Sequence, residues 1–305
     1  REDEDCIIRC YEEIEPNMDE GGKIDFDAVL SQDFDVLLVE SYRSLPYRDV
    51  EKLVRKVDAK KVLIVHNGGL DDSLRLPINI FDAVVVFDER YVREVIGRWD
   101  KRIHIIPYPC YPVENAEKRK PSFADGKFLF FSFGRQPVNE YRDFVKALAD
   151  LKSQYDLLYW VIRSDGPIPF NEPWILQERK RLEIDELYRC LHAADVHLLP
   201  KSPVPYVVVS STLYMCLGSL CPTVVPDTRH FETLPSGNNS PVIKYQDVED
   251  LKNKLIKLLE EDNYRQEVVS AAEKYVKANS VEVVAEKFIN LFNELLASQT
   301  YSCPA

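Results

Sequence analysis

The chain has 305 residues, of which 45% are hydrophobic and 30% are charged, and its formal net charge is -12. This length favours two domains of ordinary size, and the composition is typical of a globular protein that buries a core in each of them. So negative a charge argues against a general binder of nucleic acid, and no apolar run is long enough to cross a bilayer.

Short apolar runs alternate with amphipathic stretches at the start of the chain. The runs "CIIRC", "DVLLVE", "KVLIVH", "AVVVFD" and "IHIIP" are continuous and end in polar or turn residues, which is typical of buried parallel strands. Between them, "YRDVEKLVRKV" and "ERYVREVIGRW" place apolar residues three and four positions apart, as in a helix that packs on a sheet. The alternation predicts a first βαβ domain over residues 1–112.

The pattern breaks at "PYPCYPVENAEKRKPSFADG". This segment is rich in proline, contains the basic triplet Lys118, Arg119 and Lys120, and shows no apolar periodicity. Such a composition predicts a solvated linker between two domains.

The alternation then restarts and predicts a second domain over residues 113–280. Its expected strands are "KFLFFSFG", "LLYWVIRSDG", "DVHLLP" and "PTVVP", and its expected helices include "VNEYRDFVKALADLKSQY", "IDELYRCLHAA", "SSTLYMCLGS" and "DVEDLKNKLIKLLEED". A closing helical segment, residues 281–305, is expected to pack back towards the first domain. The predicted fold class is therefore α/β, with two Rossmann-like, doubly wound parallel-sheet domains facing a cleft.

Residues that directly follow parallel strands are the first candidates for a binding site, because open α/β sheets bind ligands at the carboxyl ends of their strands. In the second domain these candidates are Gly134, Arg135, Ser164, Asp165, Gly166, Lys201, Ser202, Ser210, Ser211, Thr212 and Asp227. Residues 196–226 contain no Asp or Glu, which suits a phosphate or pyrophosphate group near these cations and hydroxyls. The alternative is a buried strand–helix–strand segment, which lacks acids for that reason alone and begins its helix with an ordinary serine cap.

The sequence lacks the motifs of several other classes of enzyme and binding site. No glycine-rich dinucleotide loop, phosphate-binding P-loop or GxSxG serine motif occurs. The seven cysteines are scattered and form no CxxC pair, so we expect reduced thiols and no zinc site. No signal peptide is visible, so we expect a cytoplasmic protein, with peripheral attachment to a membrane left open.

Five segments, in order, resemble group 1 glycosyltransferases of the GT-B fold (glycosyltransferase family 4-like). "IDELYRCLHAADVHLLPKSP" is similar to the helix and strand that end at their donor site, and "KFLFFSFGRQPVNEYRDFVKAL" to their first C-domain strand, Gly-Arg turn and helix. "CPTVVPDTRHFETL", "KRIHIIPYP" and "KVLIVHNGG" resemble further strands of these enzymes. The likeness extends over roughly residues 35–240.

The resemblance implies a hexosyltransferase that moves a sugar from a UDP- or GDP-linked donor to a hydroxyl acceptor in a glycan, a lipid or a small molecule. It implies retention at the anomeric carbon, no metal and no cofactor. Arg135 matches the arginine that contacts the donor phosphates, His66 the histidine near the reacting sugar, and Glu232 the glutamate after the "PVV" strand. We expect Lys201 to counter the charge of the leaving diphosphate.

The chain departs from the family pattern in three places. The lysine that usually follows the Gly-Arg turn corresponds to Asn139, and Arg142 is the candidate substitute. The family's pair of glutamates is missing, because residues 205–215 hold no carboxylate. The first domain is short and lacks the family's opening strand and glycine-rich turn.

These departures keep two alternatives to a transferase open. One is a GT-B-like binding or scaffold protein without catalysis. The other is a nucleotide-sugar epimerase or hydrolase, which would need a carboxylate or histidine cluster that the sequence does not show.

Overall fold

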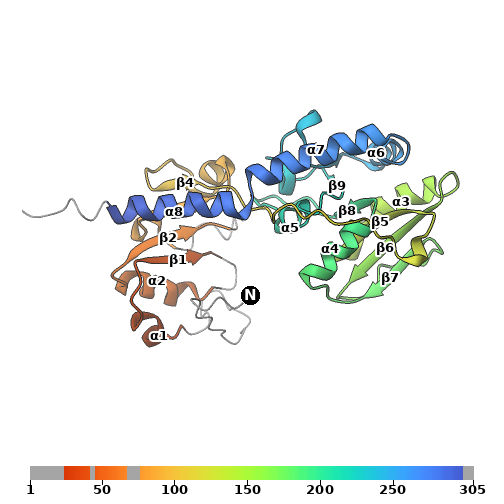
Figure 1. Ribbon diagram of the computed structural model, residues 1–305. Coiled ribbons are helices and arrows are strands. Elements are labelled where there is room, and N and C mark those ends of the chain that lie inside the picture. The colour runs from red at the N-terminus through yellow and green to blue at the C-terminus, as the bar shows by residue number, and fades with distance from the viewer. Residues whose placement is uncertain (1–23, 42–44, 67–75, 298–305) are drawn as a thin grey trace, which may run out of the picture. The chain divides into compact units, whose positions relative to one another are not determined.

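The computed structural model describes residues 24–41, 45–66 and 76–297 (Figure 1). The chain divides into two compact units: unit 1 comprises Arg1–Ile105 with Phe292–Ala305, and unit 2 comprises Ile106–Leu291. Each unit holds one parallel β-sheet with helices, which confirms the predicted α/β class. The predicted strand "CIIRC" lies outside the described residues.

Unit 1 contains a four-stranded parallel sheet whose spatial order, β1-β2-β3-β4, follows the chain. The strands are β1 (Val36–Glu40), β2 (Lys60–Ile64), β3 (Ala83–Val86) and β4 (Ile103–Ile105), and the α-helices are α1 (Phe26–Leu30) and α2 (Tyr47–Lys56). All four residues of β3 are buried, as expected for a continuous apolar run at the centre of a sheet.

The predicted helix over residues 89–99 differs from the expected α-helix. It is a π-helix over Tyr91–Ile96, and the amide of Gly97 donates to the carbonyl of Val92, five residues earlier, at 2.9 Å. Gly97 has φ 77°, a left-handed conformation that glycine adopts without strain, and it ends the helix there.

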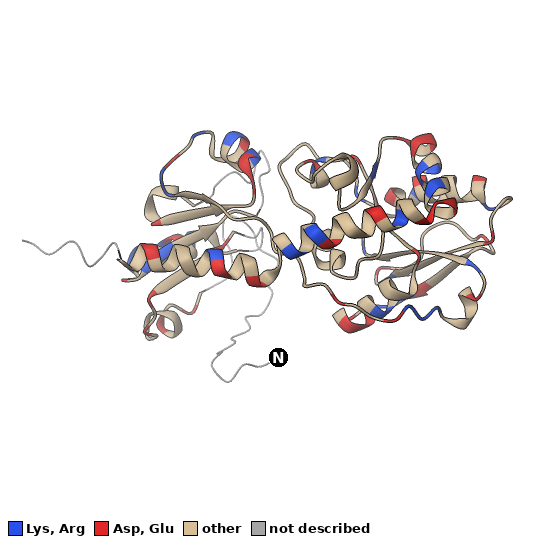
Figure 2. Ribbon diagram, turned by 45° about the horizontal axis from the view of Figure 1, so that its top comes forward, with Lys and Arg blue, Asp and Glu red and all other residues tan. Residues whose placement is uncertain are grey.

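Unit 2 contains a six-stranded parallel sheet in the order β10-β9-β8-β5-β6-β7. The strands are β5 (Phe128–Gly134), β6 (Leu157–Arg163), β7 (Ile175–Arg179), β8 (Val196–Leu198), β9 (Thr223–Pro226) and β10 (Ile243–Tyr245). The helices are α3 (Arg142–Leu151), α4 (Ile184–Ala193), α5 (Ser211–Leu217), α6 (Val248–Glu260) and α7 (Asp262–Ala278), and α8 (Val281–Ala297) closes the described chain. Both acidic and basic residues occur along α7 and α8 (Figure 2).

The sheet of unit 2 buries an apolar core on each face. Phe130 of β5 packs in one core with Phe144 of α3 and Leu251 of α6, whereas Phe131 packs in the other with Leu187 of α4. Adjacent residues of one strand therefore enter opposite cores, as a doubly wound sheet requires.

The sequence did not predict β7 and β10, which are the two edge strands of this sheet. The residues of β7, "ILQER", are only partly buried or exposed, and β10 has three residues with Lys244 in the middle. Edge strands need less apolar sequence than central ones, so neither shows the continuous apolar run that marks the others.

The basic triplet is exposed and lies outside any helix or strand, as the sequence predicted, but two of its side chains are held by ion pairs. Lys118 and Lys120 both form ion pairs with the carboxylate of Asp195, which also accepts a bond of 2.7 Å from the amide of Leu129. Asp195 precedes β8, so its carboxylate ties the segment to the sheet of unit 2.

The same segment passes close to the end of α5. A Cβ atom on Gly218 would lie 2.3 Å from the carbonyl oxygen of Pro112 and 2.7 Å from that of Tyr111. The amide of Glu114 donates to the carbonyl of Gly218 at 2.9 Å. Only a residue without a side chain fits this approach, so Gly218 is required by packing and not by its backbone angles.

Candidate functional site

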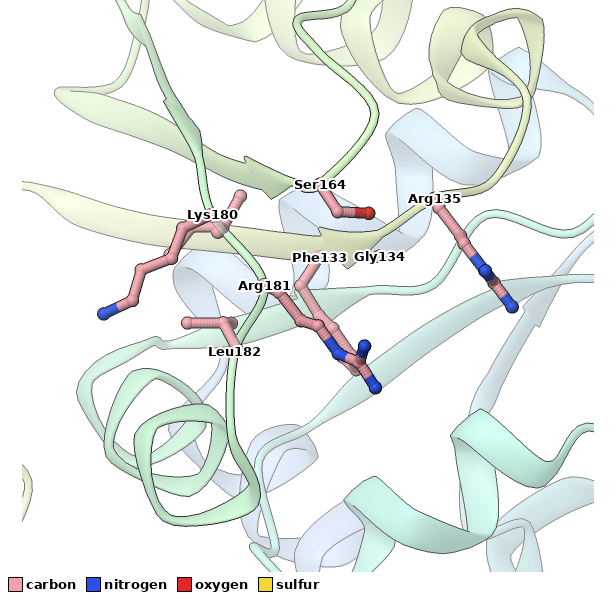
Figure 3. Close-up of a pocket in the computed structure, with 8 residues that line it drawn as sticks. Phe133, Gly134, Arg135, Ser164, Lys180, Arg181 and Leu182 are labelled. Atoms are coloured by element: carbon pink, nitrogen blue, oxygen red, sulfur yellow. The ribbon is translucent and has the colours of Figure 1, made fainter. Parts of the chain in front are cut away.

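A cavity of about 390 Å³ lies at the carboxyl ends of three neighbouring strands of unit 2 (Figure 3). Gly134 and Arg135 line it after β5, Ser164 lines it after β6, and residues 180–182 line it after β7. The parallel register, in which Gly134 pairs with Arg163, brings these three strand ends together. This is the edge of an open α/β sheet at which ligands bind.

The turn after β5 has a conformation that suits glycine. Gly134 has φ 114°, and a Cβ atom there would lie 2.5 Å from Oε1 of Gln136. Glycine therefore allows the strand to turn sharply, and the following residue, Arg135, is exposed at the rim of the cavity.

Three basic side chains line the cavity, and two of them have no acidic partner in the described part of the chain. Arg135 and Arg181 direct their guanidinium groups to one side, whereas the ammonium group of Lys180 points the other way (Figure 3). Lys180 lies 2.5 Å from Oε1 of Glu186, but neither arginine has an ion-pair partner among residues 24–41, 45–66 and 76–297. Two guanidinium groups in an otherwise acidic protein suit a ligand with more than one phosphate oxygen.

Lys201 follows β8, the neighbour of β5 on its other side, and does not line this cavity. Its side chain is partly buried, and no carboxylate of the described segments lies within ion-pair distance of it. Burial lowers the pKa of Lys201, and the negative charge of Glu140 opposes that shift. The structure thus places a poorly solvated ammonium group on the same sheet edge as Arg135.

The hydroxyl groups at the start of α5 have separate roles. Ser210 is buried and caps the helix, because its Oγ accepts from the amide of Leu213 at 3.3 Å. Ser211 is exposed and Thr212 is partly buried in the first turn. None of the three lines the cavity.

The structure also keeps Arg142 and Glu232 away from the cavity lining. Arg142 is exposed at the first position of α3. Glu232 is exposed, and its Oε2 lies 3.3 Å from Nε of Arg229, whose Nη1 donates to the carbonyl of Pro205 at 3.1 Å. Glu232 is therefore associated with an arginine that anchors the loop before α5.

His66 lies in unit 1, just beyond the end of β2. Its Nε2 is 3.3 Å from Oε2 of Glu40, and its ring meets the edge of Phe87 with centroids 5.1 Å apart. The hydroxyl of Tyr91 donates to the carbonyl of His66 at 3.0 Å. Sequence reasoning missed Glu40, although its position at the end of β1, beside β2, is a signal that could have found it.

The lining residues Lys180, Arg181 and Leu182 were also missed. They follow β7, and without a prediction of that strand no reason existed to place them at the sheet edge. The sequence signal that could have found them is the run of basic residues "RKR" at positions 179–181, which closes the weakly alternating stretch "ILQER".

The four cysteines in the described part of the chain, Cys110, Cys190, Cys216 and Cys221, are buried and unpaired, as expected for reduced thiols. Within the same part, no three His, Cys, Asp or Glu side chains are gathered as a metal site requires. No helix there has the length and apolar character needed to span a bilayer.

No protein-family model matches the chain. Among solved structures, it resembles TarM with a TM-score of 0.61 at 15% identity, over 85% of this chain and 54% of TarM. It resembles a glycosyltransferase from Rickettsia africae ESF-5 with a TM-score of 0.66 at 14% identity, over 86% of this chain and 77% of the other. It resembles the E. coli trehalose-6-phosphate protein bound with UDP-2-fluoro glucose with a TM-score of 0.66 at 12% identity, over 87% of this chain and 74% of the other.

These likenesses show the fold of the chain. Its two parallel-sheet units match those of GT-B glycosyltransferases, as the sequence resemblance implied. The chain spans only about half the length of TarM.

Proposed function

We propose that the protein is a glycosyltransferase that moves a sugar from a nucleotide-diphosphate-sugar donor to a hydroxyl acceptor. The observation that carries this proposal is the cavity at the ends of β5, β6 and β7, where Arg135 and Arg181 present guanidinium groups without acidic partners in the described residues. A neighbour of the same fold binds UDP-2-fluoro glucose, a donor of this class.

In this proposal the cavity binds the diphosphate of a UDP- or GDP-linked hexose. Charge-assisted hydrogen bonds from Arg135 and Arg181 stabilise the phosphate oxygens, each by about 1.5–3 kcal/mol. Lys201 stabilises the negative charge that develops as the diphosphate leaves, so that no metal ion is needed for it.

His66 completes the proposal from unit 1. Glu40, 3.3 Å from Nε2, would orient the ring, so that Nδ1 would accept a hydrogen bond from a hydroxyl of the acceptor. The reaction we propose is transfer with retention at the anomeric carbon, as in the family that the sequence resembles.

Ligand-induced stabilisation tests the donor site. We expect UDP, GDP or one of their sugar conjugates to stabilise the protein by about 2.7 kcal/mol at a hundredfold excess over its dissociation constant. Arg135→Ala should weaken the binding of that ligand by about 10- to 150-fold, because a charge-assisted hydrogen bond worth about 1.5–3 kcal/mol is lost. Lys146→Ala is a matched control, since Lys146 is exposed on α3 and does not line the cavity. Equal affinities in the two variants would contradict the proposed site.

A second candidate function is nucleotide-sugar binding without turnover. It is favoured by residues 196–226, which include β8, β9 and the whole of α5 and contain no carboxylate that could face a transferred sugar. Release of UDP or GDP from a bound donor, measured over a panel of hydroxyl acceptors, separates the candidates. A donor that binds but is never consumed favours the second.

A further inference from the structure

Arg163, the last residue of β6, carries a buried guanidinium group that is not part of the proposed donor site. The residue is 4% exposed. Its Nη1 donates to the carbonyl of Gly166 at 2.5 Å, and its Nη2 donates to the carbonyl of Gln136 at 2.8 Å. The group also lies over the ring of Tyr141, 5.4 Å from the centroid.

A buried charge of this kind requires an explanation. No carboxylate in the described segments lies within ion-pair distance of Arg163, so its charge is stabilised by carbonyl oxygens and an aromatic face. Removing a guanidinium group from water without a counterion is costly, and an apolar residue would fill the end of a strand more cheaply. The two hydrogen bonds are therefore the feature that an apolar residue cannot replace.

Both bonds end in turns that border the cavity. Gln136 follows Arg135 directly, and Gly166 lies two residues after Ser164. Across the sheet, Arg163 is the register partner of Gly134, so its side chain begins beside the glycine of the first turn. One planar group thus ties together the turns after β5 and β6.

We propose that Arg163 is a positioning residue, which fixes the turn over residues 134–136 so that Arg135 faces the cavity before a ligand arrives. A guanidinium group suits this role because its planar fork donates in two fixed directions, whereas an ammonium group lacks that geometry. Holding a cation in place beforehand removes the cost of ordering it when the ligand binds. The identity of that ligand, a nucleotide diphosphate, rests on the proposed function.

Amide hydrogen exchange tests the positioning role without any ligand. In the wild type we expect the amides of Glu140 and Arg142, which donate to the carbonyls of Pro137 and Asn139 directly after the turn, to be protected in the free protein, and Arg163→Lys should raise their exchange at least severalfold. Arg55→Lys, an exposed change of the same type on α2 in unit 1, should leave them unchanged. A turn that already exchanges freely in the wild type would overturn the proposal, even if the Arg163→Lys protein does not fold.

Titration with UDP and GDP by calorimetry then tests how Arg163 acts. We expect Arg163→Lys to weaken the bound nucleotide about 10-fold, and to have no further effect in an Arg135→Ala background, because it acts through Arg135. If Arg163→Lys weakens nucleotide binding by the same factor in the wild type and in the Arg135→Ala background, the positioning role is wrong. If the wild type binds neither nucleotide, the proposed function fails, while the exchange experiment still decides the role of Arg163.

Discussion

Acidification from pH 7 to pH 5 should destabilise unit 2 through one side chain, that of His197 in β8. The residue is fully buried, and its ring stacks on Phe133 with centroids 5.7 Å apart. Its Nδ1 lies 3.4 Å from the hydroxyl of Thr223. Burial lowers the pKa of His197 from 6.5 to about 3, so the imidazole is neutral in the folded protein over this whole range.

The size of the effect follows from the two pKa values. The unfolded chain takes up a proton near pH 6.5, whereas the folded chain does so only near pH 3. His197 therefore costs no stability above pH 6.5, and it lowers the free energy of unfolding progressively as the pH falls from 6.5 towards 3. At about 1.4 kcal/mol per pH unit, the loss between pH 6.5 and pH 5 is about 2 kcal/mol.

Urea unfolding followed by tryptophan fluorescence measures this loss. A Trp99→Phe background removes the 64% exposed tryptophan of unit 1 and leaves Trp160 and Trp174, which are 8% and 9% exposed in unit 2. The comparison variant is His197→Leu, which cannot be protonated at this position. We expect the wild-type background to lose about 2 kcal/mol more than this variant between pH 7 and pH 5.

The test compares how much unfolding free energy each protein loses between pH 7 and pH 5, with and without His197→Leu. Every other titrating group is common to both proteins, so the difference between the two losses belongs to His197. Parallel losses of stability over the same pH range would refute the reasoning. They would mean that His197 is solvated in the folded protein or finds a partner that stabilises its protonated form.

Two packing features give further predictions. Gly218→Ala should lower the stability of unit 2 by about 1–3 kcal/mol, because the new Cβ would lie 2.3 Å from the carbonyl of Pro112; an unchanged urea midpoint would contradict this close approach. Burial alone would raise the pKa of Asp195, but the hydrogen bonds that its carboxylate accepts, including those from Lys118 and Lys120, lower the pKa instead. Asp195 therefore stabilises the folded protein above pH 3.8, and this stabilisation is lost as the pH falls below that value. Asp195→Asn should therefore release the basic segment at neutral pH, and limited trypsin digestion should cut there at least several times faster than in the wild type; equal rates would contradict the anchoring role.

The sequence alone determined the class of the fold and most of its elements. Runs such as "KFLFFSFG" are apolar at consecutive positions, and only a central strand covered on both faces buries all of them. The structure confirms this, since Phe130 and Phe131 enter opposite cores. The edge strands β7 and β10 escaped prediction, because a strand with one neighbour and partial burial needs no such run.

For the site, the sequence pointed to Gly134 and Arg135 through a strand that ends in a glycine. Beyond the basic run "RKR", it did not indicate that Arg181 lies beside the same cavity, and it did not indicate that Arg163 binds the turn after β5. These relations depend on the register of parallel strands, which joins residues far apart in the chain. The ion pair of Lys118 with Asp195, 77 residues away, arises in the same way. Local periodicity records which side of a strand is buried, but only the assembled sheet decides which strand ends become neighbours.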